Sequence, residues 1–423
     1  MEFPDLLKRF ISYVKIDTRS DEDSQTFPST AGQLALAEIL KDDLLEMGLS
    51  DVHVNEHGYV FGTLKTNQDG QSPVIALIAH LDTSPDVSGS GVNPQIHNNY
   101  DGRDIILSER PDVIIRADEN PALKDKIGKT IITTDGTTLL GADDKAGIAE
   151  IMSAIRYLTD HPELPIPHIR ILFTPDEELG HGTEKLTINE IAADIGYTVD
   201  GETAGEIEDE TFCADMVNIR VCGINVHPGK AKGKMVNAIK IASEILECFP
   251  KDCLSPETTD GEDGYIHPHF ISGTVEEANI TVLIRDFKEE GLKDKEAFIL
   301  SVVVEARGRH PKATIFFDIE RSYRNMKQVL DNYPEVIETA EEAIRQSGLT
   351  PVRTNIRGGT DGARLSFMGL PTPNLFTGGY NFHSRYEWIA LEDMEKAAEV
   401  IVRLMGLWAE KGSRKNQGVE SLP

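Results

Sequence analysis

Residues 74–84 read Val-Ile-Ala-Leu-Ile-Ala-His-Leu-Asp-Thr-Ser, and this stretch decides the fold. Its first six residues, Val74–Ala79, form a continuous apolar run, which is typical of a strand buried on both faces of a sheet. The run ends in His80-Leu81-Asp82, an imidazole and a carboxylate. A buried strand that ends in such groups indicates an α/β sheet with its chemistry at the strand ends.

The same arrangement recurs twice further along the chain. His168–Thr174 predicts a strand that ends in Pro175-Asp176-Glu177-Glu178, and Ile195–Val199 predicts a short strand that ends in Asp200. Ligands of open α/β sheets gather at the carboxyl ends of strands. We therefore expect one cluster at this edge of the sheet, made of His80, Asp82, Glu177, Glu178 and Asp200.

Two further groups stand in turns. Asp143 lies in Gly141-Ala142-Asp143-Asp144-Lys145-Ala146-Gly147, which opens a helix, and His383 follows the glycine-rich loop 378–382. Imidazoles and carboxylates without thiolates are the ligands of a hydrolytic zinc that keeps a position open for water. Crowded carboxylates repel one another unless divalent cations are present, and one carboxylate can bridge two ions about 3.5–4 Å apart. The sequence therefore predicts a metal centre.

The rest of the chain predicts one α/β domain interrupted by a smaller one. Segments on either side of the insertion, 1–212 and 323–423, alternate strands with helices, for example at Thr30–Met47, Lys145–Tyr157, Pro334–Gln346 and Leu391–Lys411. The inserted segment, 213–322, follows the order β-α-β-β-α-β of the ferredoxin-like unit. Its predicted elements are strands at Met216–Val226, Phe270–Val275, Asn279–Phe287 and Ala313–Ile319, and helices at Met235–Phe249 and Lys288–Arg307.

Composition narrows the class of protein. The 423 residues are 39% apolar and 27% charged, and no stretch approaches the about 20 apolar residues of a membrane span. A net charge of −29 argues against nucleic acid as a partner. The acidic N-terminus does not resemble a secretory signal, so we expect a cytoplasmic protein without a membrane partner. Four cysteines without a Cys-x-x-Cys pair are interpreted as small buried hydrophobic residues.

Three segments, 79–84, 140–147 and 173–178, resemble the metal motifs of the two-zinc exopeptidase family that includes carboxypeptidases and aminoacylases. Within that family, segments 357–363 and 378–383 are similar to the tripeptide aminopeptidases. The similarity runs from near residue 1 to about 410. It implies a zinc-exopeptidase-type catalytic domain, with a mixed sheet flanked by helices, and places the family's lid at the insertion.

The resemblance implies a role for each group in the cluster. Asp143 would bridge two Zn²⁺ ions per subunit, with His80 and Asp200 completing one site and Glu178 and His383 the other. Co²⁺ or Mn²⁺ often substitutes for zinc in such sites. Asp82 would orient the imidazole of His80. The family also carries a cis peptide bond after the bridging aspartate, here between Asp143 and Asp144.

The implied activity is removal of the N-terminal residue from tripeptides by a zinc-bound water, with Glu177 as general base. His227 is a candidate donor to the oxyanion, and its alternative is a histidine in a turn at the end of a lid strand. Arg285 or Arg357 would hold the peptide's C-terminal carboxylate, although Arg285 could instead pair with Asp286 or Glu289. Asn381 is a further candidate for substrate contact. Asp176 is interpreted as a solvated loop acid, and its alternative is contact with the substrate amino group.

Other functions are compatible with the same metal-binding and catalytic residues. A two-zinc dipeptidase, carboxypeptidase or N-acyl amino acid amidohydrolase would differ only in its substrate pocket. A binding protein on an inactive hydrolase fold would have lost a ligand or the base, and all seven positions are filled here. We expect short peptides as partners and a monomer or a homodimer.

Overall fold

The computed structural model describes residues 1–68 and 72–419, so residues 69–71 and 420–423 of the predicted catalytic domain lie outside it. The chain divides into two compact units. The first contains Met1–Asp209, Met326–Thr354 and Thr360 onward, and the second contains Glu210–Asn325 and Asn355–Gly359. The predicted insertion, 213–322, lies inside the second unit. The short segment 355–359 was not predicted to belong there.

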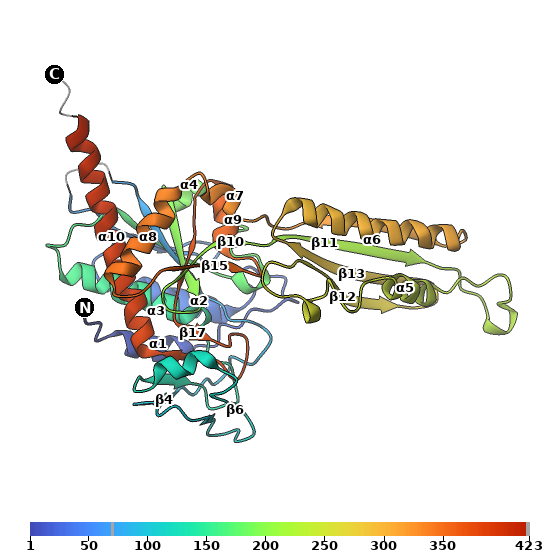
Figure 1. The fold of residues 1–423 in the computed structure, drawn as a ribbon, viewed down its shortest axis with the longest axis horizontal. Coiled ribbons are helices and arrows are strands. Elements are labelled where there is room, and N and C mark those ends of the chain that lie inside the picture. Colours follow the sequence, from blue (N-terminus) through green and yellow to red (C-terminus); the bar gives the residue numbers. More distant parts are fainter. Residues whose placement is uncertain (69–71, 420–423) are drawn as a thin grey trace. The chain divides into compact units, whose positions relative to one another are not determined.

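The first unit is built around a mixed sheet of eight strands (Figure 1). Their order across the sheet is β1 (Ser50–Val54), β2 (Val60–Leu64), β8 (Ile169–Thr174), β3 (Ile75–His80), β9 (Ile195–Gly201), β16 (Asn374–Phe376), β10 (Glu206–Thr211) and β15 (Val352–Ile356). The central strands β8, β3 and β9 are parallel, and β3 is buried along its whole length. The carboxyl ends of these three strands therefore meet at one edge of the sheet.

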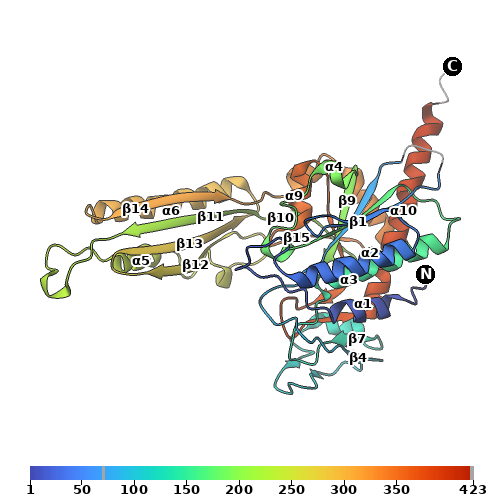
Figure 2. The same cartoon turned by 180° about the vertical axis from the view of Figure 1, so that it is seen from behind.

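Helices cover both faces of this sheet, which confirms the predicted fold class. On one face, α3 (Ala142–Asp160) packs against β3 and β9, with α1 (Leu6–Val14) and α10 (Leu391–Val419) packed on α3 and α8 (Pro334–Gln346) on α10 (Figures 1 and 2). On the same side, α2 (Ala31–Glu46) contacts β1 and β2. A separate apolar cluster on the other side joins Ala76 and Ile78 of β3 to Leu365 of α9 (Asp361–Met368) and Ile191 of α4 (Ile188–Ile191).

Two small sheets and a few short helices complete the first unit and were not predicted. One sheet joins β17 (Gly379–Tyr380), β18 (Trp388–Ala390), β7 (Ile131–Thr133) and β4 (Gln95–His97), and the other pairs β5 (Ile105–Ile106) with β6 (Ile114–Ile115). The short helices are η1 (Pro121–Lys126), η2 (Glu177–Leu179) and α7 (Lys327–Leu330). None of the helices in the described ranges combines the length and apolar character needed to cross a membrane.

The second unit has the predicted ferredoxin-like order. Its elements are β11 (Cys213–Cys222), η3 (Pro228–Lys230), α5 (Ala238–Glu247), η4 (Pro256–Thr258), β12 (Tyr265–Gly273), β13 (Glu277–Asp286), α6 (Glu289–Arg309) and β14 (Thr314–Arg321). The antiparallel sheet runs β12-β13-β11-β14. Alternate residues of β11, such as Val217 and Ile219, pack with Ile241 of α5 and Ile299 of α6 in the core of the unit.

Strand β12 and the cysteines of the second unit differ from prediction. Strand β12 begins at Tyr265, not Phe270, and contains Pro268, which an edge strand accepts because its outward N–H groups need no partner. All four cysteines are free, as expected, but only Cys213 is buried, while Cys248 and Cys253 are exposed. The prediction of buried cysteines is therefore wrong for those two residues.

Candidate metal centre

The parallel strand ends bring the predicted cluster together in the first unit. His80 ends β3, Glu177 and Glu178 form η2 just after β8, and Asp200 lies near the end of β9. In the register of β3 and β8, His80 lies directly opposite Thr174, which places η2 beside the imidazole. Asp143 comes from the start of α3 and His383 from the loop between β17 and β18. Five segments that are distant in sequence thus supply one site.

Asp143 lies between two imidazoles. Its Oδ1 is 2.8 Å from Nε2 of His80, and its Oδ2 is 3.0 Å from Nε2 of His383. His80 Nε2 is also 3.5 Å from Oδ1 of Asp200, and His383 Nε2 is 3.0 Å from Oε2 of Glu178. These contacts group the five residues into two sets of candidate ligands, called here the ligand sets, with the Asp143 carboxylate in contact with both. The Asp143–Asp144 peptide bond is cis, as the family resemblance implies.

Asp144 approaches the same atoms but serves the main chain. It forms a second group of ligand atoms with His80 and Asp200, all within 4.8 Å of one another. Its Oδ2 accepts the main-chain N–H of His80 at 3.1 Å, and its Oδ1 accepts that of Gly147 at 3.2 Å. The oxygens of Asp143, by contrast, face the two imidazoles of His80 and His383.

The charges of the cluster fit a bound cation. Burial, reinforced by the charge of Asp143, raises the pKa of Glu178 to about 8, and burial raises the pKa of Asp200 above its usual value. Burial would also raise the pKa of Asp143, but hydrogen bonds from His383 and His80 hold it well below the usual range. Among the described residues, Oε1 of Glu178 is buried without a hydrogen-bond partner. Divalent cations would offset the repulsion between these neighbouring carboxylates, and Oε1 of Glu178 would be available as a ligand atom.

Asp82 holds several residues of the cluster in position through buried contacts. Its side chain is fully buried, with Oδ1 3.4 Å and its main-chain oxygen 3.1 Å from Nδ1 of His80. These contacts favour an Nδ1–H tautomer, which leaves Nε2 of His80 as the ligand atom. The same carboxylate accepts the main-chain N–H groups of Glu177 at 3.0 Å and Glu178 at 3.2 Å. Asp82 thus orients the imidazole and fixes the main chain of both glutamates.

Two carboxylates near the cluster are buried hydrogen-bond acceptors, and this role was not predicted from the sequence. Asp176, interpreted as a solvated loop acid or a contact for the substrate amino group, is buried and accepts hydrogen bonds from Ser29 and Gln33 of the N-terminal segment. Glu387, which the sequence analysis did not single out, accepts hydrogen bonds from the loop that carries Asp143. Asp176 lies inside the motif 173–178 and Glu387 lies outside the motifs identified, and the hydrogen-bond partners of both are more than a hundred residues away in sequence.

Three predicted substrate residues belong to the second unit. Arg285 lies in β13, where Nη1 donates to the main-chain oxygens of Ile284 at 2.9 Å and Asp215 at 3.4 Å, whereas Asp286 pairs with Lys295. His227 does not end a strand, because β11 ends at Cys222. It is exposed at the start of η3, and its Nδ1 accepts the N–H of Gly229 at 3.1 Å.

The other two candidates hold loops in place. Arg357 of the second unit donates through Nη1 to the main-chain oxygens of Gly261 at 2.7 Å and Asp263 at 2.9 Å, and through Nη2 to Thr259. Asn381 of the first unit donates through Nδ2 to Oδ1 of Asn120 at 2.8 Å and to the main-chain oxygen of Tyr386 at 3.1 Å.

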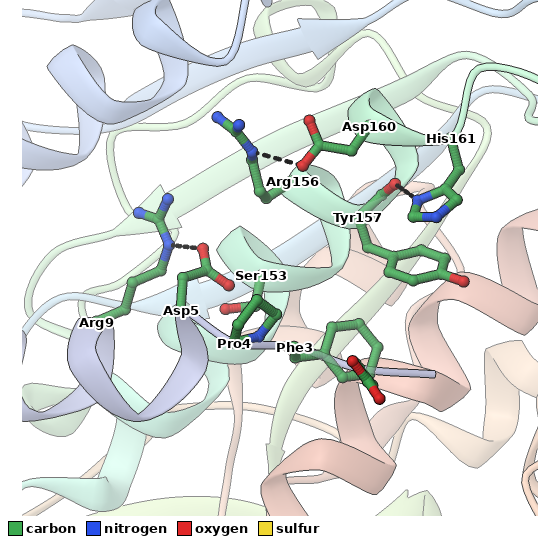
Figure 3. A pocket seen from close by; sticks show the side chains of 10 residues that line it. Phe3, Pro4, Asp5, Arg9, Ser153, Arg156, Tyr157, Asp160 and His161 are labelled. Atoms are coloured by element: carbon green, nitrogen blue, oxygen red, sulfur yellow. Dashed lines mark hydrogen bonds and ion pairs between the residues drawn. The ribbon is translucent and has the colours of Figure 1, made fainter.

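A separate hollow of about 660 Å³ lies between the N-terminal segment and the C-terminal half of α3 (Figure 3). Phe3, Ser153 and Tyr157 line it together with two arginines. Arg9 is paired with Asp5, and Arg156 with Asp160 at 2.8 Å. Because both cations are already paired, we assign no ligand to this hollow.

Comparison with known proteins agrees with this geometry. Residues 134–406 match the sequence profile of the peptidase family M20/M25/M40. A protein named Peptidase T from Caldanaerobacter subterraneus subsp. tengcongensis is 51% identical over 407 residues, which cover 96% of this chain and 99% of that protein. The chain therefore belongs to peptidase family M20/M25/M40, and the predicted resemblance to its aminopeptidase branch is confirmed.

Solved structures share the fold. The crystal structure of aminopeptidase PepT from Bacillus cereus superposes with a TM-score of 0.74 at 24% identity, covering 97% of this chain and 99% of that one. A tripeptidase from Staphylococcus aureus superposes with a TM-score of 0.76 at 21% identity, with the same coverage. At these identities the comparisons establish the fold alone.

Proposed function

We propose that this protein is a metal-dependent tripeptide aminopeptidase that removes the N-terminal residue of short peptides. The observation that carries the proposal is the Asp143 carboxylate, whose two oxygens contact His80 and His383 of two different ligand sets. The 51% identity with a protein named Peptidase T supports a peptidase activity. The similarity of segments 357–363 and 378–383 to the tripeptide aminopeptidases supports cleavage at the N-terminus and the substrate length.

We propose two Zn²⁺ ions per subunit, with Co²⁺ or Mn²⁺ as substitutes. His80, Asp143 and Asp200 would hold one ion, and Asp143, Glu178 and His383 the other. These are nitrogen and oxygen donors without thiolates, which suit hydrolytic zinc. When bound, such ions polarise the scissile carbonyl and lower the pKa of water toward about 7.

Glu177 is proposed as the general base. Asp82 fixes the main chain of Glu177. Burial raises the pKa of the Glu177 carboxyl well above its usual value, so this carboxylate has a strong affinity for a proton. Glu177 would take a proton from the attacking water and deliver it to the amine that leaves. Its neighbour Glu178 lies 3.0 Å from His383 and is left for the metal.

We propose that His227 donates to the oxyanion and that Arg285 binds the C-terminal carboxylate of the tripeptide. Arg357 is the weaker candidate for the carboxylate because both of its terminal nitrogens already donate to the loop 259–263. Asn381 is proposed to shape the loop that carries His383. A cytoplasmic location, as a monomer or a homodimer, completes the proposal, and the exposed free thiols of Cys248 and Cys253 support a reducing compartment.

The proposal is tested with a free tripeptide, the matching dipeptide and the N-acetylated tripeptide, each with zinc and with a chelator. We expect cleavage of the free tripeptide only, with release of its first residue and complete loss of activity on chelation. Equal cleavage of the acetylated tripeptide would contradict an aminopeptidase. Preference for the dipeptide would move the protein elsewhere in its family.

Arg285→Ala is expected to raise KM for the free tripeptide by about 10–100-fold with little change in kcat, because a hydrogen bond to a charged group contributes about 1.5–3 kcal/mol. Steady-state kinetics with the tripeptide and its C-terminal amide check the cause, since the amide lacks the carboxylate. Arg220→Ala, on the neighbouring strand β11, is the matched control. An equal rise in KM for acid and amide would exclude carboxylate recognition by Arg285.

A further inference from the structure

Glu387 is a carboxylate that is only 1% exposed, directly before β18. Its Oε2 accepts the main-chain N–H groups of Leu140 at 2.7 Å and Gly141 at 2.8 Å. Its Oε1 accepts those of Ala142 at 2.7 Å and Asp143 at 3.2 Å. Four consecutive amides therefore converge on one side chain that lies 244 to 247 residues away in sequence.

The main chain of this loop explains why it needs an acceptor. Gly141 has a φ of +81°, and Asp143 and Asp144 have φ/ψ values of −83°/105° and −119°/32°, which are not helical. Consecutive N–H groups in such a turn form a concave site for an anion. A buried carboxylate that accepts four N–H groups satisfies both the loop and itself, and charged acceptors make the stronger hydrogen bonds.

The position of Glu387 links two metal ligands. Glu387 accepts the main-chain N–H of Asp143, the residue that both ligand sets share. His383 lies four residues before Glu387 on the same connection between β17 and β18. The Asp143 Oδ2 to His383 Nε2 distance of 3.0 Å depends on how these two loops are held against each other.

We propose that Glu387 is a positioning residue of the metal centre, which sets the separation of Asp143 and His383 in the second ligand set. The inference rests on the proposed metal centre. The first set depends less on Glu387, because His80 and Asp200 come from the rigid strands β3 and β9. Loss of Glu387 should therefore affect the second ion more than the first.

Calorimetric titration of the metal-free protein with Zn²⁺, and absorption spectra with Co²⁺, test the proposal in the wild type and in Glu387→Gln. Glutamine keeps the shape but replaces one acceptor oxygen with a donor. We expect the first ion to bind as in the wild type, the second to bind about 10–100-fold more weakly, and the spectrum of the second Co²⁺ to change.

The matched control is Glu392→Gln. Glu392 also accepts a main-chain N–H through both oxygens, at 3.0 Å each, but from Thr130, which is outside the metal loops. We expect wild-type metal binding in this variant. Equal binding of both ions by Glu387→Gln and the wild type would overturn the role of Glu387. A wild type that binds no metal would instead overturn the proposed metal centre.

A second variant covers the case in which Glu387→Gln does not fold, which near-ultraviolet circular dichroism of the metal-free protein would reveal. Gly141→Ala leaves the Glu387 carboxylate in place but disfavours the φ of +81° that the loop requires. Its added Cβ meets only ordinary contacts, 3.4 Å or more from its neighbours. We expect the same selective weakening of the second ion, and unchanged binding of both ions would contradict the proposal.

Discussion

Replacing Glu177 by glutamine is expected to lower kcat for a tripeptide by about 10²–10⁴-fold while the metal content stays that of the wild type. Glutamine preserves the shape of the side chain and the N–H group that Asp82 accepts. It cannot take up a proton, which the raised pKa of the Glu177 carboxyl favours. The activity should therefore fall without loss of the ligands. Steady-state kinetics and elemental analysis of the same sample measure the two quantities together.

Glu184→Gln is the matched control for this result. Glu184 is an exposed glutamate shortly after η2, paired at 3.0 Å with both Lys185 and His181. We expect its kcat to equal that of the wild type. If Glu177→Gln kept kcat within tenfold of the wild type, Glu177 would not be the base. If kcat and bound metal fell in parallel, Glu177 would be a ligand instead.

Replacing Asp143 by alanine is expected to remove both metals and reduce activity below detection. Asp143 contacts both imidazoles, so its loss takes one ligand from each set at once. The loss of affinity should exceed the about 10–100-fold that removal of an outer partner costs, because a ligand itself is missing. Elemental analysis after dialysis against trace zinc, with the tripeptide assay, measures the effect.

Asp160→Asn provides the control within the same helix. Asp160 ends α3 and forms an ion pair with Arg156 at 2.8 Å, away from the ligand sets. Full metal content is expected for this variant. Retention of one ion by Asp143→Ala would show that the ion does not need the shared carboxylate, and it would contradict a bridging role for Asp143.

The predicted parts of the fold are those whose signal is local. Strand β3 is a continuous apolar run because it is buried on both faces, and helix α8 is amphipathic, so it was predicted over the same residues, Pro334–Gln346. The sheet of β4, β7, β17 and β18 could not be predicted. Its strands have two or three residues, too few for any periodicity to appear.

The candidate site also contains residues that a local sequence pattern predicts and residues that it does not. Imidazoles and carboxylates directly after buried strands could be predicted to converge, because parallel strands end at one edge of a sheet. The role of Glu387 could not, because it depends on a contact with a loop 244 to 247 residues away. Asp176 was likewise misread, since its partners Ser29 and Gln33 lie at the start of α2, far away in sequence.

The two ends of the segment Glu210–Asn325, the larger part of the second unit, meet in the structure. The N–H of Ala214 donates to the oxygen of Tyr323 at 2.9 Å, and the N–H of Ser322 donates to the oxygen of Ala214 at 3.1 Å. The chain thus leaves this unit beside the point where it entered. For the host sheet, an insertion with adjacent ends is equivalent to a short surface loop, because the host has little closure entropy to lose. A lineage of such enzymes can therefore exchange, enlarge or discard this module without rerouting the strands that present the metal ligands.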